Sequence, residues 1–211
     1  MATVEKVLSI ARRELGTKED PANSNEVLYN DWYWGKHVSG KNYPWCMVWV
    51  QWCFDKAGAK LPYVTASCSG LLTWYQRNHP ECVHKNPAPG DIVIYNFGHT
   101  GIVESVQGTT ITAIEGNTSP SAGGSQSNGG MVCRKTRGLK TVTAFIRPDF
   151  KKEDKRMDNT PSPAHKEGVE WAKKNGILTG DAAGDLKLTE PVTRQLLCTM
   201  LYRYAKKNGK I

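Results

Sequence analysis

The sequence predicts an α+β protein in which N-terminal helices pack on an antiparallel sheet and a second, small all-α domain follows. Three observations support this class. Apolar residues recur with helical spacing in the first part of the chain. Short β-branched runs then alternate with glycine-containing turns as far as residue 147. Helical spacing returns in the last 48 residues or so, after a charged stretch that also contains prolines.

The N-terminal part contains three expected helices. Residues 3–15 predict the first, because valines and leucines follow three/four spacing between a Thr3 cap and Gly16. A second helix is expected to begin at Pro44, since proline fits the first helical position, and to end at Gly58. The third covers about 67–78. An aromatic segment, 29–34, lies between the first two.

The middle part reads GDIVIYNFGHTGIVESVQGTTITAIEGN and predicts an antiparallel meander. Within it, 102–107 and 110–114 are expected to form a hairpin. Residues 119–130 are rich in serine, glycine and asparagine and predict a surface loop. Further strands are expected near 131–134 and 141–147.

The chain is expected to divide into three segments. Residues 1–150 form the larger domain, 151–163 are a charged linker that contains Pro, Ser and Thr, and 164–211 form a small helical domain. The tail should contain helices over 165–175 and 192–207. It is short for a domain that is stable alone.

Composition and charge restrict the partners. The 211 residues have a net charge of +8, with 15 basic and 12 acidic residues in 1–150 and 13 and 8 in the remainder. Such an excess suits a polyanionic partner, namely nucleic acid, an anionic membrane or an anionic cell wall. Nucleic acid is the weaker choice, because the sequence has no helix-turn-helix or RNA-binding motif. No apolar run approaches the roughly 20 residues of a membrane span.

The N-terminus carries charges throughout, so no secretory signal is predicted. The protein is expected to be made in a cytosol, and any action outside the cell would need another exit route. The six cysteines are then expected to be reduced thiols. Zinc is not expected, because Cys82 and His84 lack a second ligand pair at suitable spacing.

Two cysteines in NYPWCMVWVQWCF differ in predicted reactivity. If Pro44 begins the helix, Cys46 is its third residue and lies beside unpaired N–H groups at the positive end of the helix dipole. That position lowers a thiol pKa. Cys53 lies two turns further on the apolar stripe, where a cysteine is a small core residue. Cys46 is therefore the candidate nucleophile.

A thiolate nucleophile needs a base, and the base needs an orienting group. His99 is the best candidate because it lies in a turn at the start of a strand. The other four histidines lie in polar or helical surface contexts: His37, His79, His84 and His165. Glu115 and Asn117 lie two apart on a strand and hence on one side of it. An odd-length loop at Gly108 would place both on the face of His99, whereas a two-residue loop would require a bulge. We predict the odd loop.

These motifs together resemble a CHAP domain, the cysteine/histidine-dependent amidohydrolase/peptidase group related to papain-like peptidases. The matching stretches are YPWCMVWVQWCF, GDIVIYNFGHTGIVESV and IEGNT. In addition, ARRELGTKEDPANSN resembles the start of CHAP domains in phage endolysins of Gram-positive hosts.

The resemblance implies a papain-like fold and hydrolysis of peptidoglycan without a cofactor. The bond cleaved is either the amide between muramic acid and the stem peptide or a bond within the peptides. Cys46 would be the nucleophile and His99 the base and later the acid. Glu115 would orient the imidazole, assisted by Asn117.

The sequence departs from the family in two places. Many members have Gly-Gln before the nucleophile, where this chain has Pro44-Trp45. The Cys46 backbone N–H and the Tyr43 hydroxyl remain as oxyanion donors, and Trp45 is expected to line the substrate groove. Some members bind calcium. Here the acidic residues lack the spacing of a dedicated loop, so no metal is expected and calcium is the alternative: Glu19, Asp20 and Asp31.

The tail resembles a single surface-layer-homology repeat in EWAKKNGILTGD and VTRQLLCTMLYRY. The resemblance implies binding to cell-wall polymers, with Arg194 as the contact for an anionic glycan. The family's Thr-Arg-Ala-Glu signature is only half matched, by Thr193-Arg194. Because such repeats usually act in threes, homo-oligomerisation through the tail and a purely structural helical module are alternatives.

Other functions use the same features. A cellular wall-remodelling hydrolase would need the same chemistry. A cysteine acyltransferase or deamidase would use the same three groups on another acceptor. A non-catalytic wall-binding protein would not need Cys46 at all.

Overall fold

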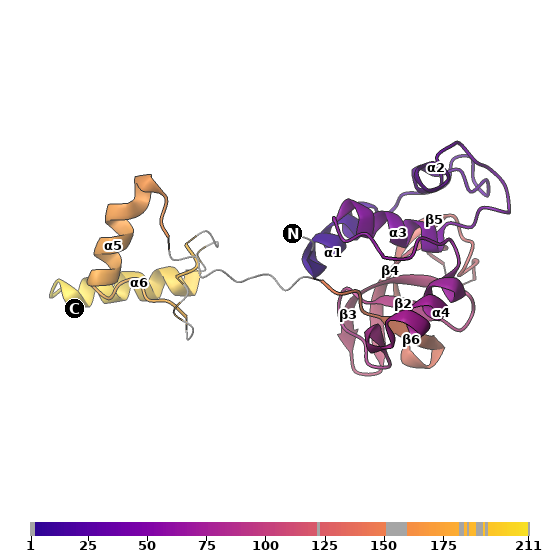
Figure 1. The fold of residues 1–211 in the computed structure, drawn as a ribbon. Helices are drawn as coiled ribbons and strands as arrows, with labels where there is room; N and C mark the ends of the chain where they lie inside the picture. Colours follow the sequence, from indigo (N-terminus) through magenta and orange to yellow (C-terminus); the bar gives the residue numbers. More distant parts are fainter. Residues whose placement is uncertain are drawn as a thin grey trace. The chain divides into compact units, whose positions relative to one another are not determined.

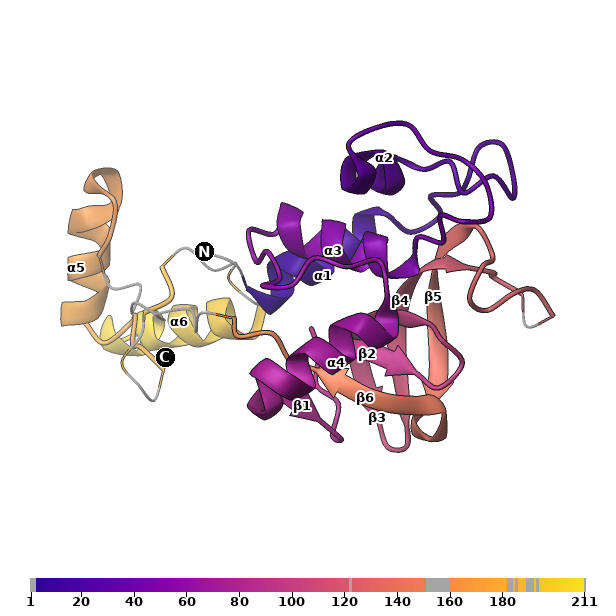
Figure 2. The same cartoon turned by 45° about the vertical axis from the view of Figure 1, so that its right-hand side comes forward.

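The computed structural model describes residues 3–121, 123–150, 160–181, 184, 186–188, 192 and 194–210. The chain divides into two compact units, Met1–Lys152 and Glu153–Ile211, which are described separately below. Figures 1 and 2 show the larger unit as helices packed on a sheet.

The larger unit confirms the predicted α+β class. Its helices are α1 Val4–Arg13, α2 Leu28–Trp34, α3 Cys46–Lys56 and α4 Cys68–Asn78, with short 3₁₀ turns at Pro80–Cys82 and Leu139–Thr141. Its strands are β1 Val83–His84, β2 Ile92–Tyr95, β3 Thr100–Gln107, β4 Thr110–Thr118, β5 Met131–Gly138 and β6 Val142–Ile146. They form one antiparallel sheet in the order β1-β6-β2-β3-β4-β5.

The main core lies between α1, α3 and α4 and one face of the sheet (Figure 2). α3 is at its centre and packs on β3 and β4. A smaller apolar cluster lies on the opposite face and includes Val93, Tyr95, Val103 and Phe145. The alternation of the two clusters along β2 and β3 reflects the two-residue period of a strand.

Helix α3 begins at Cys46 and not at Pro44, so that prediction was wrong by two residues. Trp45 occupies the cap position with φ −115° and ψ 13°. Its fully buried indole donates a hydrogen bond from Nε1 to Glu19 Oε1 at 2.8 Å, which holds this residue outside the helix. Cys46 is consequently the first helical residue, where its backbone N–H has no acceptor within the helix.

The hairpin between β3 and β4 has a two-residue loop, because Gln107 pairs with Thr110. The odd loop predicted from the sequence is therefore wrong. The register shifts instead between Val103 and Ser105, so Glu104 is the extra residue of a β-bulge. Its carboxylate accepts hydrogen bonds from Arg12 and Arg134. The bulge changes the register by one residue, as an odd loop would have done.

The smaller unit contains a 3₁₀ turn at Pro163–His165 and two helices, α5 Lys166–Lys174 and α6 Arg194–Lys207. The aromatic rings of Trp171 and Tyr204 lie 6.2 Å apart, and Arg203 donates to the carbonyl of the buried Ile177 at 3.3 Å. No described residue of α5 or α6 is buried. Several large apolar side chains of this unit are exposed: Trp171, Val192, Leu197, Leu201 and Tyr202.

In the part of the chain that the structure describes, no helix has the length and apolar character required to cross a membrane.

The contact between α3 and β4 requires a glycine. A Cβ at Gly116 would lie 2.8 Å from Trp49 Cβ and 3.0 Å from the Trp45 ring. We expect Gly116→Ala to lower the free energy of unfolding by about 1–3 kcal/mol, as overpacking of a core does. Gly138→Ala is the matched control, because its φ of −74° suits alanine and the nearest atom is 3.8 Å away. The two variants are compared by thermal unfolding. If Gly116→Ala and Gly138→Ala lower the midpoint temperature equally, the close packing at Gly116 is contradicted.

Candidate active site

Cys46 lies at the start of α3 with its side chain 5% exposed. Its Sγ is 3.8 Å from the Sγ of Cys68. A hydrogen bond from Cys68 lowers the pKa of the Cys46 thiol against the effect of burial, and His99 and the Met47 backbone N–H lower it further. These contacts favour the thiolate form of Cys46 in a site that excludes most water.

Cys68 is the first residue of α4 and was not predicted to take part in the site. Its pKa is raised, first by the contact with Cys46 and then by burial. Either sulfur could donate in the S–H···S contact, and the opposite directions of the two pKa shifts favour Cys68 as the donor. The only sequence signal was its position at the start of an expected helix, which is the same signal that selected Cys46.

His99 lies in the turn between β2 and β3 and is fully buried. Its Nε2 is 3.2 Å from Glu115 Oε2. Neither ring nitrogen makes a hydrogen bond of ordinary angle to the described residues. The contact with Glu115 is an ion pair when the imidazole is protonated. Burial opposes charge on the imidazole, but the contacts with Cys46 and Glu115 outweigh it and raise the pKa of His99 to about 9.

Glu115 is 0% exposed and its carboxylate is fully engaged. The Tyr95 hydroxyl donates to Oε1 at 2.8 Å. Arg137 donates from Nε to Oε1 at 3.0 Å and from Nη2 to Oε2 at 2.6 Å. Burial opposes the charge, but Arg137 and then His99 outweigh it and lower the pKa of Glu115. Glu115 is therefore a charged carboxylate.

Arg137 and Tyr95 are the residues around Glu115 that sequence analysis missed. Arg137 was outside the predicted strand near 131–134, whereas β5 continues to Gly138. Its guanidinium lies 5.5 Å from the ring centroids of both Tyr95 and Phe97. Both rings also stack with the His99 imidazole, with centroid distances of 6.0 Å for Tyr95 and 5.9 Å for Phe97. Arg137 therefore supports both the carboxylate and the aromatic wall beside the imidazole.

Gly101 provides the space for the Glu115 side chain. A Cβ at this position would lie 2.7 Å from Glu115 Cγ and 2.8 Å from the Ile114 carbonyl oxygen. Ile114 belongs to the main core, on the face of the sheet that the helices cover. Because side chains alternate along a strand, the adjacent Glu115 points to the opposite face, where Tyr95 lies.

Asn117 lies close in sequence but is engaged elsewhere. Its φ is +57°, and the β4–β5 register shifts between Glu115 and Thr118. Its Nδ2 donates to Asn128 Oδ1 at 3.0 Å, and its Oδ1 accepts from the Gly130 backbone N–H at 3.1 Å. The Asn117 side chain therefore binds Asn128 and Gly130, whereas the sequence predicted that it would help to orient His99. The register shift interrupts the strand alternation on which that prediction was based.

Residues 38–117 match the model of one protein family, described as the CHAP domain. The matched range contains Cys46, His99, Glu115 and Asn117. Residues 38–117 form a CHAP domain.

Two solved structures are similar to this chain at low identity. One, described as a wild-type endolysin LysIME-EF1, is 15% identical with a TM-score of 0.46 and covers 83% of this chain and 87% of its own. The other, Ly7917, is 18% identical with a TM-score of 0.41 and covers 69% of this chain and 62% of its own. No curated protein matches the sequence significantly. These likenesses are too distant to support an argument about the site.

The residues expected to bind substrate lie in different places. Trp45 is 0% exposed and packs against Tyr29 at 5.4 Å, so the prediction that it lines the groove of the CHAP domain is wrong. Its position in the core follows from the hydrogen bond to Glu19. Tyr43 is half-buried against Trp34, with ring centroids 5.4 Å apart. Arg194 is exposed at the first position of α6 in the other unit, and Thr193 lies outside the described residues.

The acidic residues considered for calcium have protein partners or lie at the surface. Glu19 accepts from the Trp45 indole, Asp31 lies 3.3 Å from the His37 ring, and Asp20 is exposed. Among the residues that the structure describes, no group of three His, Cys, Asp or Glu side chains could hold a metal ion.

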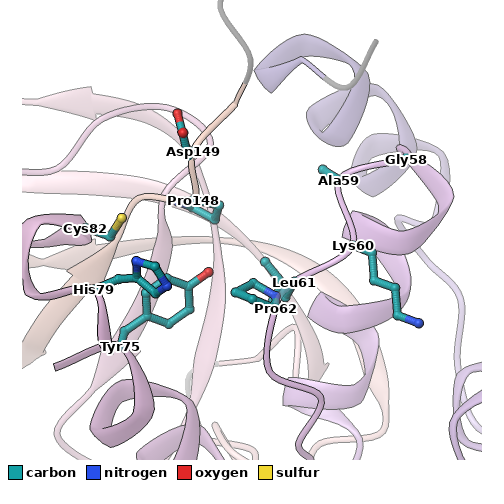
Figure 3. Close-up of a pocket in the computed structure, with 10 residues that line it drawn as sticks. All are labelled: Gly58, Ala59, Lys60, Leu61, Pro62, Tyr75, His79, Cys82, Pro148 and Asp149. Atoms are coloured by element: carbon teal, nitrogen blue, oxygen red, sulfur yellow. The ribbon is translucent and has the colours of Figure 1, made fainter. Parts of the chain in front are cut away.

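A cavity of about 500 Å³ lies elsewhere in the larger unit (Figure 3). Tyr75 and His79 face Leu61 and Pro62 across it, with Asp149 at its edge. Its lining residues do not include Cys46, Cys68, His99 or Glu115, so the cavity is separate from the candidate active site.

The charge on His99 depends on Glu115. We expect Glu115→Gln to lower the pKa of His99 from about 9 by roughly 1–3 units, the usual effect of losing one adjacent opposite charge. Titration of the labelled imidazole by NMR measures it. Glu81→Gln is the control, because it removes an exposed carboxylate that lies 3.1 Å from another histidine, His79, and it should leave His99 unchanged. An unaltered His99 titration in a folded Glu115→Gln protein would refute the ion pair.

Proposed function

We propose that this chain hydrolyses amide bonds of Gram-positive peptidoglycan through the Cys46 thiolate. The presence of a CHAP domain supports a peptidoglycan hydrolase. The observation that carries the mechanism is the placement of Cys46 as the first residue of α3 and of the buried His99 with its Nε2 3.2 Å from Glu115 Oε2. The directions of the two pKa shifts agree with this placement, since the pKa of the Cys46 thiol is lowered and that of His99 is raised. A thiolate and an imidazolium side by side are the reactive form of a cysteine hydrolase.

The first half of the reaction begins without a proton transfer to His99. The Cys46 thiolate attacks the amide carbonyl, and His99, already protonated, donates its proton to the departing amine. An acyl-enzyme remains on Cys46. The neutral imidazole then takes a proton from water, which attacks the thioester and releases the acid. Glu115 favours the imidazolium at each stage where His99 carries charge, and Arg137 keeps Glu115 ionised.

The tetrahedral intermediate requires donors for its oxyanion. With Trp45 in the core, we assign this role to the backbone N–H of Cys46, which lies at the start of α3. The positive end of the helix dipole adds to this stabilisation. The half-buried Tyr43 hydroxyl is the second donor from the sequence analysis.

The smaller unit is proposed to bind the wall. Its excess of basic residues suits anionic wall polymers, and Arg194 is exposed at the start of α6. The setting that fits best is a phage endolysin that reaches the wall after release from the host cytoplasm. One similar structure is itself described as an endolysin.

The central test is lysis of purified Gram-positive walls. We expect Cys46→Ala to lower the rate of turbidity loss about 10³-fold or more, because removal of a nucleophile disables the whole catalytic group. Cys198→Ala is the control, since Cys198 is an exposed thiol in the smaller unit. Full lysis by Cys46→Ala would show that the chain lyses walls by a route that does not use Cys46.

Mass spectrometry of the released fragments identifies the bond. New amino termini on stem-peptide or cross-bridge residues indicate an endopeptidase, whereas free muramic acid carboxylates with intact peptides indicate an amidase. Transfer of the acyl group to an added amine in preference to water would instead favour an acyltransferase. Absence of any product from folded wild-type protein would contradict the proposed function.

Activity should follow a bell-shaped pH profile. The rate rises as Cys46 ionises, and the lowered thiol pKa places this rise below the usual range for cysteine. The rate falls as His99 loses its proton near its pKa of about 9. We expect kcat/KM on a soluble muropeptide to show both limbs. An activity that continues to rise above pH 10 or so would contradict an active imidazolium.

A further inference from the structure

The sulfurs of Cys46 and Cys68 meet where two helices begin. Cys46 is the first residue of α3, and Cys68 is the first residue of α4. Their Sγ atoms are 3.8 Å apart, and the side chains are 5% and 9% exposed. The positive ends of both helix dipoles therefore act on one pair of thiols.

The segment before Cys68 is held in place by α3 itself. Gln51, a buried residue of α3, donates from Nε2 to the carbonyl oxygens of Tyr63 at 3.1 Å and Thr65 at 3.4 Å. Thr65 Oγ1 then accepts from the Ser67 N–H, and Ser67 Oγ caps α4 through the Gly70 N–H at 3.0 Å. One helix thus fixes the starting points of both thiols, so their contact is a built feature.

We propose that Cys46 and Cys68 form a site of reversible oxidation by hydroperoxides, in which Cys68 is the resolving thiol. The proposal rests on the proposed function in one respect, namely that oxidation of Cys46 stops hydrolysis. Formation of the disulfide itself needs only the geometry of the two thiols.

The chemistry takes place in two balanced steps. The Cys46 thiolate attacks the terminal peroxide oxygen, the O–O bond breaks, and Cys46 becomes a sulfenic acid. The departing alkoxide, or hydroxide from hydrogen peroxide, takes the proton of the His99 imidazolium. Cys68 then attacks the sulfenic sulfur, forms the S–S bond and releases water. The two thiols have been oxidised and the peroxide has been reduced to an alcohol or water.

The charges favour this order of events. Cys46 is the thiolate and reacts first, whereas the pKa of Cys68 is raised chiefly by its contact with Cys46. Once Cys46 is a neutral sulfenic acid, the negative charge that opposes ionisation of Cys68 is gone. A disulfide needs an S–S distance of about 2.05 Å, so the sulfurs must approach by roughly 1.8 Å.

The pair would protect the nucleophile. A sulfenic acid without a nearby thiol proceeds to sulfinic acid, which ordinary thiols do not reduce. A disulfide is returned to two thiols by a dithiol reductant. The other buried cysteines lie apart from this pair: Cys53 is two turns along α3, and Cys133 Sγ lies 3.8 Å from the Thr118 carbonyl oxygen.

The test uses the full chain with Cys198→Ser, which removes the exposed thiol that could join two molecules. The protein is treated with hydrogen peroxide, the free thiols are blocked with iodoacetamide, and peptides are mapped by mass spectrometry. We expect a Cys46–Cys68 cross-linked peptide as the main product. Wall lysis should fall about tenfold or more and return after dithiothreitol, because the disulfide is reducible.

Cys68→Ser is the matched variant, because its hydroxyl keeps a donor beside Cys46 but cannot form the bridge. Each protein is compared with its own rate of lysis before oxidation, because loss of the Cys68 thiol also changes the pKa of Cys46. We expect Cys68→Ser to lose that activity irreversibly after oxidation, with Cys46 found as sulfinic acid. Cys68→Ala is used in addition if the serine variant melts early. A wild-type map without the cross-link, or recovery of the folded variant to the wild-type level, overturns the proposal.

The two hypotheses fail in different ways. If the cross-link forms but Cys46→Ala still lyses walls, the oxidation site stands and the proposed catalytic role of Cys46 fails. If Cys46→Ala is inactive but no cross-link forms, the catalytic role stands and the oxidation site is refuted.

Discussion

The site depends on keeping a carboxylate charged where water cannot reach it. Glu115 is fully buried, and an isolated ionised carboxyl in such a place would take up a proton. Arg137 prevents this through two charge-assisted hydrogen bonds, and the Tyr95 hydroxyl provides a third. Glu115 can then hold His99 as an imidazolium, and His99 in turn helps to keep Cys46 ionised. The charge on Cys46 is thus supported by Arg137, with His99 and Glu115 between them in the chain of contacts.

This chain of charges requires four neighbouring strands in one register. Tyr95 ends β2, His99 precedes β3, Glu115 lies on β4 and Arg137 lies on β5. A shift of one residue between β3 and β4 would move Glu115 to the face covered by the helices. The bulge at Glu104 sets the register, and Arg12 and Arg134 bind the bulged residue from α1 and β5. A surface ion-pair cluster therefore contributes to the geometry of a site that it does not touch.

The sequence was sufficient where one local pattern determined the result. Helical spacing predicted α1 and α4, and strand alternation predicted the sheet. Cys46 and His99 were selected by their positions at element boundaries. The sequence was insufficient where a contact between distant segments determined the structure. The indole of Trp45 binds Glu19, and this contact delays the start of α3. Arg137 could be found only by extending β5 and knowing its register against β4, and neither is visible in the spacing of residues.

The start of α3 also explains how this chain differs from relatives with Gly-Gln before the nucleophile. A glutamine there could support an oxyanion, but Trp45 has a buried indole that anchors the segment to Glu19. In the proposed mechanism, the helix starts support the negative charge instead. The backbone N–H of Cys46 is available for the oxyanion, and the Cys68 thiol is available for the thiolate. The second donor differs from an amide in one respect, because sulfur can be oxidised. A site that stabilises its nucleophile with a second thiol therefore acquires redox chemistry by the same contact that makes the nucleophile reactive.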